Sequence, residues 1–249
     1  MEVKGFILET QNNGRMSSTV STIFEIIRDH NLLRPDNRYD IKECHYNDLD
    51  TKLLNGMIPV GSIAFVNKAL RLLGKNEMKP INIPEELNSY DILRRKTATV
   101  KSQAEIARKF KEWNTDKLFV KSNTSIKRFV SDLYPLWWKD FPEDEYFVSE
   151  RLDIVSEWRC FVHYGKLRSI KNYSGDEWTM PYNFFVEDCI NRIGENIKSY
   201  TLDVAVLKDG NNAVIEVHNF ISCGLYGFDD DIILPMLING YKRELQINE

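Results

Sequence analysis

The sequence predicts a small α/β domain followed by a larger α+β domain. Strand-like and helix-like segments alternate in the first third of the chain, an irregular stretch follows at 75–93, and short β-type runs dominate the second half. A chain of 249 residues is long enough for one or two domains with their own cores. We therefore expect an N-terminal domain of residues 1–92 and a second domain of residues 93–249.

The N-terminal domain is expected to open with a β-α unit. Apolar spacing predicts a strand at 3–8, a helix at 19–30, a loop and then a strand within 58–66, and a helix at 66–73. Gly74 is expected to end the last of these helices. The prolines and asparagines of residues 75–93 indicate a connector between the domains.

The second domain is expected to contain a mainly antiparallel sheet. A surface helix at 101–113 precedes a strand at 118–121. Five β-type runs follow, separated by turn signals, at 146–150, 158–164, 167–173, 201–207 and 213–218. Helices are expected at 185–200, lying against the sheet, and at 232–245.

The composition excludes several classes of protein. Hydrophobic residues make up 43% of the chain and charged residues 28%, which is ordinary for a folded globular protein. The net charge of −4 argues against nonspecific nucleic-acid binding, which depends on neutralising phosphates with Lys and Arg. Because no leader is recognisable and no apolar run approaches the roughly 20 residues of a membrane span, we expect a cytoplasmic protein that binds neither nucleic acid nor membranes.

Two carboxylates on the last predicted hairpin form the first candidate site. Asp203 interrupts an apolar strand, and Glu216 lies between Ile215 and Val217. Burying such groups is costly without a cation, and oxygen ligands on a rigid hairpin suit Mg²⁺. The hairpin alone is equally consistent with an alternative to a metal site, in which both carboxylates face solvent on alternating strands.

Basic residues upstream form a second candidate site. Lys121 ends an apolar strand and Lys127 follows after a polar loop. A strand-end ammonium can hold phosphate, although such a lysine is more often simply solvated. Glu157 and Arg159 share one strand face, where they either pair with each other or leave the guanidinium for a polyphosphate.

The order of these segments resembles that of the ATP-grasp superfamily, in which nucleotide is held between two α+β subdomains. The sequence is most similar to the R-two-K clade, which occurs in phage and bacterial genomes. The similarity spans roughly residues 90–230 and rests on Phe119-Val120-Lys121 with Lys127-Arg128-Phe129, Ser149-Glu150, Glu157 to Val162, Tyr173 to Asp176, Leu202 to Val206, Val214 to Val217 and Gly224 to Gly227. It implies that residues 93–150 grip the nucleotide and that residues 151–249 bind metal and phosphate.

The resemblance also implies a role for each of these residues. Lys121 is expected to bind the α- and β-phosphates, with Lys96 as a second phosphate contact. Arg159 is expected to face the γ-phosphate, and Lys127 is a further catalytic candidate. The adenine pocket is expected to be lined by Ser149, Glu150, Arg151, Leu152 and Asp153. Asp203 and Glu216 are expected to carry two Mg²⁺ ions.

One position departs from the family pattern, which places an Asn two residues after the metal-binding Glu. Here His218 stands at that position and Asn219 follows it. Strand alternation puts His218 on the Glu216 face, and imidazole is a poor Mg²⁺ ligand. Three alternatives follow: His218 contacts phosphate or substrate, a bulge brings Asn219 to the metal, or one metal position is weakened. We therefore treat His218 as a catalytic candidate and Asn219 as a metal-ligand candidate.

The reaction that the resemblance implies is ATP- and Mg²⁺-dependent ligation of a carboxylate to an amine through an acyl phosphate. The partners are then ATP and an unknown carboxylate–amine pair, with peptides and proteins among the candidates. Two alternatives stay open. The domain is a degenerate nucleotide-binding module without turnover, or it transfers phosphate directly to a hydroxyl group.

Overall fold

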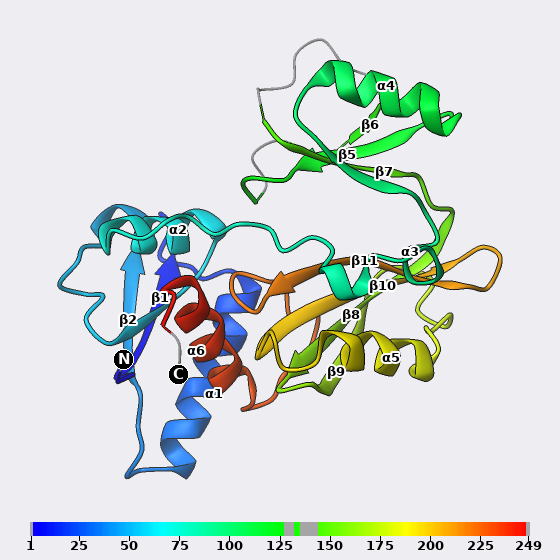
Figure 1. Cartoon of the computed structure of the whole chain (residues 1–249). Coiled ribbons are helices and arrows are strands. Elements are labelled where there is room, and N and C mark those ends of the chain that lie inside the picture. The colour runs from blue at the N-terminus through cyan, green and yellow to red at the C-terminus, as the bar shows by residue number, and fades with distance from the viewer. Residues whose placement is uncertain (1, 127–131, 135–143, 248–249) are drawn as a thin grey trace.

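The computed structural model describes residues 2–126, 132–134 and 144–247, and it has the expected mixed α/β architecture. Three separate sheets organise these residues (Figure 1). The first belongs to the N-terminal part of the chain, the second forms a lobe above the rest, and the third carries the last hairpin. The second and third sheets lie within residues 93–249, which were expected to form the second domain.

The N-terminal sheet is parallel, with strand order β2-β1-β3. Its strands are β1 (Gly5–Thr10), β2 (Asp40–His45) and β3 (Met57–Val60), and the short 3-10 helix η1 (Tyr46–Asp48) follows β2. Its helices are α1 (Ser18–Leu33) and α2 (Ile63–Leu72). Both helices begin after a serine whose hydroxyl accepts a hydrogen bond from a backbone N–H of the first turn.

The expected loop-strand-helix order at 58–73 is wrong by several residues. Residues 57–60 form the strand, and the helix already begins at Ile63. The cause is Gly61-Ser62, a turn with an N-cap, which ends the strand and starts the helix. β2 was not expected because three of the six residues of its DIKECH sequence are charged and exposed, as on an edge strand.

A long connector leads from the first sheet to the second, as expected for residues 75–93. It contains η2 (Glu85–Leu87) and the single-turn helix α3 (Tyr90–Leu93). The connector lies against the third sheet: Asn82 forms a β-bridge with Val217 of the last strand.

The second sheet has strand order β4-β7-β5-β6 and is covered by α4 (Gln103–Trp113). Its strands are β4 (Thr97–Val100), β5 (Leu118–Ser122), β6 (Asp132–Tyr134) and β7 (Tyr146–Glu150). The helix, β5 and β7 match the expected elements. The short strands β4 and β6 lie at the edges of the sheet and were not expected.

The third sheet is antiparallel, as predicted, with strand order β11-β10-β8-β9. Its strands are β8 (Ile154–His163), β9 (Lys166–Gly175), β10 (Ser199–Leu207) and β11 (Asn212–Asn219). Helix α5 (Asn183–Ile193) packs on one face. It is shorter than the expected 185–200, because Gly194 adopts a positive φ of 61° and residues 199–200 already belong to β10.

The C-terminal helix α6 (Ile233–Glu244) joins the first and third sheets. One core contains Phe6 of β1, Ile23 of α1, Phe161 of β8 and Leu237 of α6. In Figure 1 this helix lies beside α1 and β1, far from it in sequence. No helix among the described residues is long and apolar enough to cross a membrane.

Candidate functional site

A row of charged residues crosses the third sheet on the face opposite α5. Strand pairing places Lys171 of β9 opposite Arg159 of β8, Arg159 opposite Asp203 of β10, and Asp203 opposite Glu216 of β11. Directly paired residues point to the same side of a sheet. The two carboxylates of the last hairpin are therefore neighbours, and they face the same side as the guanidinium.

Arg159 and Asp203 form a buried bidentate ion pair. Arg159 Nε donates to Asp203 Oδ1 at 2.8 Å, and Nη2 donates to Oδ2 at 2.7 Å. Only 10% of the Arg159 side chain and 2% of the Asp203 side chain are exposed. Burial opposes the charge on Arg159, but the hydrogen bonds and the charge of Asp203 outweigh it and raise the pKa of the guanidinium. The alternative prediction, that the hairpin carboxylates face solvent, is therefore wrong for Asp203.

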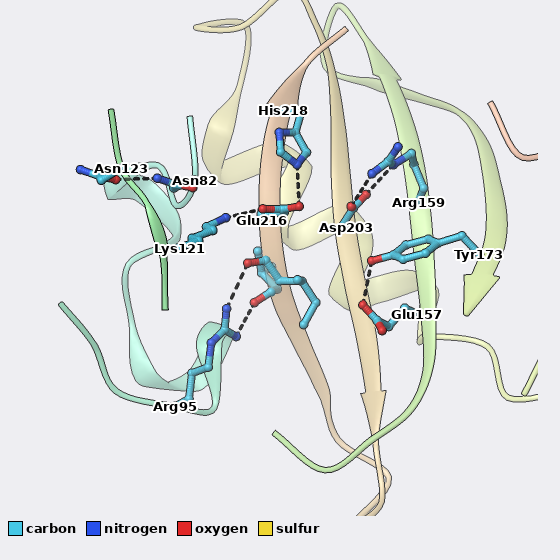
Figure 2. A network of polar contacts seen from close by, with 12 residues as sticks. Asn82, Arg95, Lys121, Asn123, Glu157, Arg159, Tyr173, Asp203, Glu216 and His218 are labelled. Carbon is cyan, nitrogen blue, oxygen red and sulfur yellow. Dashed lines mark hydrogen bonds and ion pairs between the residues drawn. The ribbon is translucent and has the colours of Figure 1, made fainter. Parts of the chain in front are cut away.

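Two stacked tyrosine rings lie beside the Arg159 guanidinium. Its central carbon lies 5.5 Å from the Tyr173 ring centroid and 5.2 Å from that of Tyr226. The Tyr173 hydroxyl donates to Glu157 Oε2 at 2.9 Å, so Glu157 is occupied by a tyrosine while Arg159 pairs with Asp203 (Figure 2). Cation–π contacts of this kind favour the charged guanidinium at this position.

Glu216 is held between residues from two different sheets. Lys121 of β5 reaches across from the second sheet to form an ion pair with Glu216 Oε2, and His218 Nε2 lies 2.6 Å from Glu216 Oε1 (Figure 2). Burial would raise the pKa of the Glu216 carboxyl, but the His218 hydrogen bond and the Lys121 charge lower it well below its ordinary value. Glu216 is thus an anion that is held by a lysine of the second sheet and a histidine of the third.

The space between the two sheets is a cavity of about 320 Å³. Lys121, Arg159, Glu216, His218 and Tyr226 are among the residues that line it. Asp203, Glu216 and His218 each offer one ligand atom within 4.8 Å of the others, which makes them a candidate metal site. The structure therefore brings five of the predicted site residues into one place, namely Lys121, Arg159, Asp203, Glu216 and His218.

Asn219 also lines this cavity, but its side-chain amide makes its hydrogen bonds elsewhere. Its side-chain amide donates to Gly240 O at 2.8 Å and to Glu244 Oε1 at 2.6 Å, so it faces α6. The register from Asp203–Glu216 to Tyr200–Asn219 is continuous, and the bulge in this strand pair lies between Asp203 and Val204 instead. Strand alternation turns the Asn219 side chain away from that of Glu216, and its role as a metal ligand stays a prediction.

The predicted adenine-binding segment forms the crossing from the second to the third sheet. Ser149 is buried and Leu152 packs near β10, whereas Arg151 and Asp153 are exposed. Glu150 accepts from the Lys96 backbone N–H at 2.8 Å and lies 3.3 Å from Lys96 Nζ. None of these residues is among those that line the 320 Å³ cavity, so their roles stay predictions. Lys127 lies outside the described residues.

Arg95 supports the site in a way that the sequence did not indicate. It is 6% exposed and donates to the backbone carbonyls of Val214, at 2.7 Å, and Ile215, at 3.0 Å. Burial lowers its pKa to about 10, against the favourable charge of Glu216. It thereby fastens the outer edge of β11 immediately before Glu216. In the sequence, the run Arg94-Arg95-Lys96 looks like a solvated turn. Only the structure shows that its middle residue, Arg95, is buried and bonded to β11.

Replacing Arg95 with Lys is expected to lower the free energy of unfolding by about 1–3 kcal/mol, because the guanidinium reaches the two carbonyls from two nitrogens in a fixed planar fork that a compact ammonium does not reproduce. Urea unfolding followed by circular dichroism measures this. The matched control is Arg94→Lys, since Arg94 is exposed. Equal stability of the two variants would exclude the anchoring role of Arg95.

The second and third sheets thus form two α+β units on either side of a cavity, with Lys121 on one and the paired carboxylates Asp203 and Glu216 on the other. A family model described as an ATP-grasp domain, family 2 of the R-two-K clade, matches residues 93–236, and the chain belongs to this family.

Solved structures with this fold cover almost the whole chain. An ATP-grasp RimK domain protein from Sphaerobacter thermophilus has a TM-score of 0.58 and 16% identity, covering 95% of this chain and 99% of that one. A D-alanine–D-alanine ligase from Bacillus anthracis has a TM-score of 0.56 and 15% identity, covering all of both chains. The D-cycloserine synthetase DcsG has a TM-score of 0.57 and 10% identity, covering 96% of this chain and all of that one. At these identities the likeness concerns the fold, and comparison with curated protein sequences gives no match.

Proposed function

We propose that this protein is an ATP- and Mg²⁺-dependent ligase that joins a carboxylate to an amine through an acyl phosphate. The observation that carries the proposal is the pairing of charges around the cavity. Lys121 pairs with Glu216, and Arg159 pairs with Asp203. Magnesium-bound ATP offers negative phosphate oxygens and a positive metal ion. Lys121 and Arg159 can therefore move to the phosphate oxygens while Glu216 and Asp203 bind the metal. No buried charge is left alone by this exchange.

Two of the three candidate ligands, the carboxylates, fit magnesium, and the third, an imidazole, does not. Asp203 and Glu216 supply carboxylate oxygens on adjacent strands, and Mg²⁺ typically takes one or two protein carboxylates together with phosphate oxygens and water. The imidazole of His218 is not a ligand that Mg²⁺ prefers. We propose that Asp203 and Glu216 hold the metal, which when bound neutralises charge on the transferred phosphate.

The residues of the chain act mainly by positioning and by neutralising charge. We propose that Lys121 binds the α- and β-phosphates and that Arg159, which lies beside two tyrosines, binds the γ-phosphate. A substrate carboxylate oxygen bonds to the γ-phosphorus while the bond to the β–γ bridging oxygen breaks, releasing ADP. The amine nitrogen then bonds to the acyl carbon, and inorganic phosphate leaves.

In this scheme residues 93–150 grip the nucleotide and residues 151–249 hold metal and phosphate. The hinge at Ser149 to Asp153 is proposed to line the adenine pocket because it joins the two sheets between which the cavity lies. Lys96, which already contacts Glu150 of this hinge, is proposed as a second phosphate contact.

Trapping with hydroxylamine tests the reaction. Hydroxylamine attacks acyl phosphates. The protein is incubated with hydroxylamine, ATP, Mg²⁺ and a panel of amino acids and short peptides, and the expected result is a hydroxamate with one ADP released per hydroxamate formed. ADP released without hydroxamate in the presence of hydroxyl compounds would favour phosphoryl transfer instead. No ADP from any mixture, despite ATP binding, would favour a nucleotide-binding module.

The binding module is the second candidate function, and His218 is the observation that favours it. A histidine at 2.6 Å from Glu216 takes a place where the metal would otherwise find an oxygen ligand. His218→Asn is expected to keep or increase ATP turnover with Mg²⁺ and to lower the preference for Mn²⁺, which accepts imidazole more readily. Turnover with each metal, compared between wild type and variant, measures this. Loss of turnover with unchanged ATP binding would instead make His218 a catalytic group.

A further inference from the structure

The loop between β9 and α5 exposes a group of large apolar side chains. Trp178 is 86% exposed and Phe184 is 71% exposed, and more than half of Met180 and of Tyr182 is exposed. The rings of Tyr182 and Phe184 stack on each other, with their centroids 5.5 Å apart. Single exposed apolar residues are ordinary, but a group of this size commonly marks an interaction surface. We call these four residues the apolar patch.

The backbone that carries the apolar patch is held in place by hydrogen bonds. The Asp176 carboxylate accepts from the Trp178 backbone N–H at 3.0 Å and from the Thr179 hydroxyl at 2.6 Å. The carbonyl of Thr179 accepts from the Ser156 hydroxyl at 2.6 Å and from the Trp158 ring nitrogen at 2.9 Å, both on β8. Because the loop is already ordered, a partner that covers the patch avoids much of the entropy cost of fixing a mobile segment.

The apolar patch lies apart from the candidate nucleotide site. None of its four residues is among those that line the 320 Å³ cavity. Phe184 belongs to the first turn of α5, and in Figure 1 this helix lies on the side of the third sheet away from the second sheet. The exposure of the patch is therefore not explained by nucleotide binding.

Acidic residues border the apolar patch. Glu177 directly precedes Trp178, and Glu187 follows Phe184 by three positions on α5, which places both on one helix face. The sequence contains no Lys or Arg from 172 to 191. In the part of the chain that the structure describes, Glu177 and Glu187 form no ion pair, whereas the cation that follows this segment is already paired with other carboxylates. The surroundings of the patch therefore carry negative charge.

This charge selects the kind of partner. Nucleic acids and anionic membranes are negatively charged, so Glu177 and Glu187 disfavour both. A symmetric dimer through the patch would bring the same two carboxylates of both copies together, which is also unfavourable. A segment with apolar and cationic side chains complements the surface. Its apolar groups cover the rings, and its cations pair with the carboxylates or lie on the aromatic faces.

We propose that the apolar patch binds a basic peptide segment of a partner protein, one that combines Lys or Arg with large apolar residues. Trp, Tyr, Phe and Met are the residue types enriched at such interfaces, and exposed Trp and Tyr often supply most of the binding energy. The inference does not depend on the proposed ligase activity, because the patch and the nucleotide cavity share no residue.

Fluorescence anisotropy with the full chain tests this with three short labelled peptides. The first combines lysine with leucine, the second glutamate with leucine, and the third lysine with serine. Only the lysine–leucine peptide is expected to bind, and its binding is expected to weaken as salt is added. Equal binding of the glutamate–leucine or the lysine–serine peptide overturns the inference.

The double variant Trp178→Ser with Phe184→Ser is expected to raise the dissociation constant of the lysine–leucine peptide at least about tenfold, because it removes the two most exposed rings of the patch. The matched control is Leu32→Ser with Leu33→Ser, which removes two similarly exposed apolar residues from α1. It is expected to leave the dissociation constant within about twofold of wild type. Equal weakening by the two double variants overturns the inference.

The variant Glu187→Lys tests the role of charge without changing the apolar patch. It is expected to weaken binding of the lysine–leucine peptide by about threefold to tenfold, more than Glu43→Lys, which makes the same change of net charge on exposed β2. Equal effects of these two variants would mean that net charge alone attracts the peptide, and they would overturn the assigned site.

Two further measurements on the wild type and on Trp178→Ser address other occupants. A dimer in analytical ultracentrifugation, or binding to phosphatidylglycerol vesicles, that Trp178→Ser abolishes would overturn the inference in favour of a second copy or a membrane. Titration with a magnesium–ATP analogue is expected to give the same dissociation constant for wild type and Trp178→Ser. A weaker affinity in the variant would make the patch part of the nucleotide site and overturn its separate role.

Discussion

Replacing Arg159 with Met is expected to lower the free energy of unfolding by about 3–5 kcal/mol and to abolish measurable binding of a magnesium–ATP analogue. The loss of stability follows because Asp203, which is 2% exposed in its side chain, would be left as a buried carboxylate without its bidentate partner. Urea unfolding measures the first effect and calorimetric titration the second.

The double variant Arg159→Met with Asp203→Asn separates the two effects. It removes both charges, so it is expected to regain at least about 2 kcal/mol of the stability lost by Arg159→Met alone. It is still not expected to bind the nucleotide, because both a phosphate contact and a metal ligand are gone. A change in stability below about 0.5 kcal/mol for Arg159→Met would show that the pair does not contribute as the buried geometry implies.

Lys121→Met is expected to weaken binding of the same analogue by about 30-fold, or roughly 2 kcal/mol. Lys121 is the residue that connects the second sheet to Glu216 of the third, and Met keeps much of its length without its charge. In the ligand-free protein Glu216 retains the hydrogen bond to His218, so the fold is expected to persist.

The matched control for this variant is Lys101→Met, an exposed lysine on the same lobe. It is expected to leave the dissociation constant within about twofold of wild type, because removing a charge outside the cavity affects only screened long-range interactions. Equal weakening by both variants would mean that net charge, and not the Lys121 contact, governs binding.

Much of the site follows from patterns that are local in sequence. Asp203 and Glu216 could be recognised because each interrupts an apolar strand, and a short polar turn between the strands makes them neighbours. His218 could be placed on the Glu216 face by alternation alone, and the same alternation argues against Asn219. The family pattern suggested an Asn at this site, and Asn219 packs against α6 instead.

The features that sequence patterns missed depend on contacts between distant segments. The Arg159–Asp203 pair requires the register of β8 against β10, which joins residues 44 positions apart. The anchoring of β11 by Arg95 spans 119 positions, from Arg95 to Val214.

We propose that the cavity between β5 and β11 binds ATP together with magnesium. Calorimetric titration of the full chain with a non-hydrolysable ATP analogue, with and without Mg²⁺, measures this. Magnesium-dependent binding at micromolar strength, about 8 kcal/mol, is expected. Absence of binding, or binding of equal strength without the metal, would contradict the assignment of Asp203 and Glu216 as metal ligands and of the cavity as the nucleotide site.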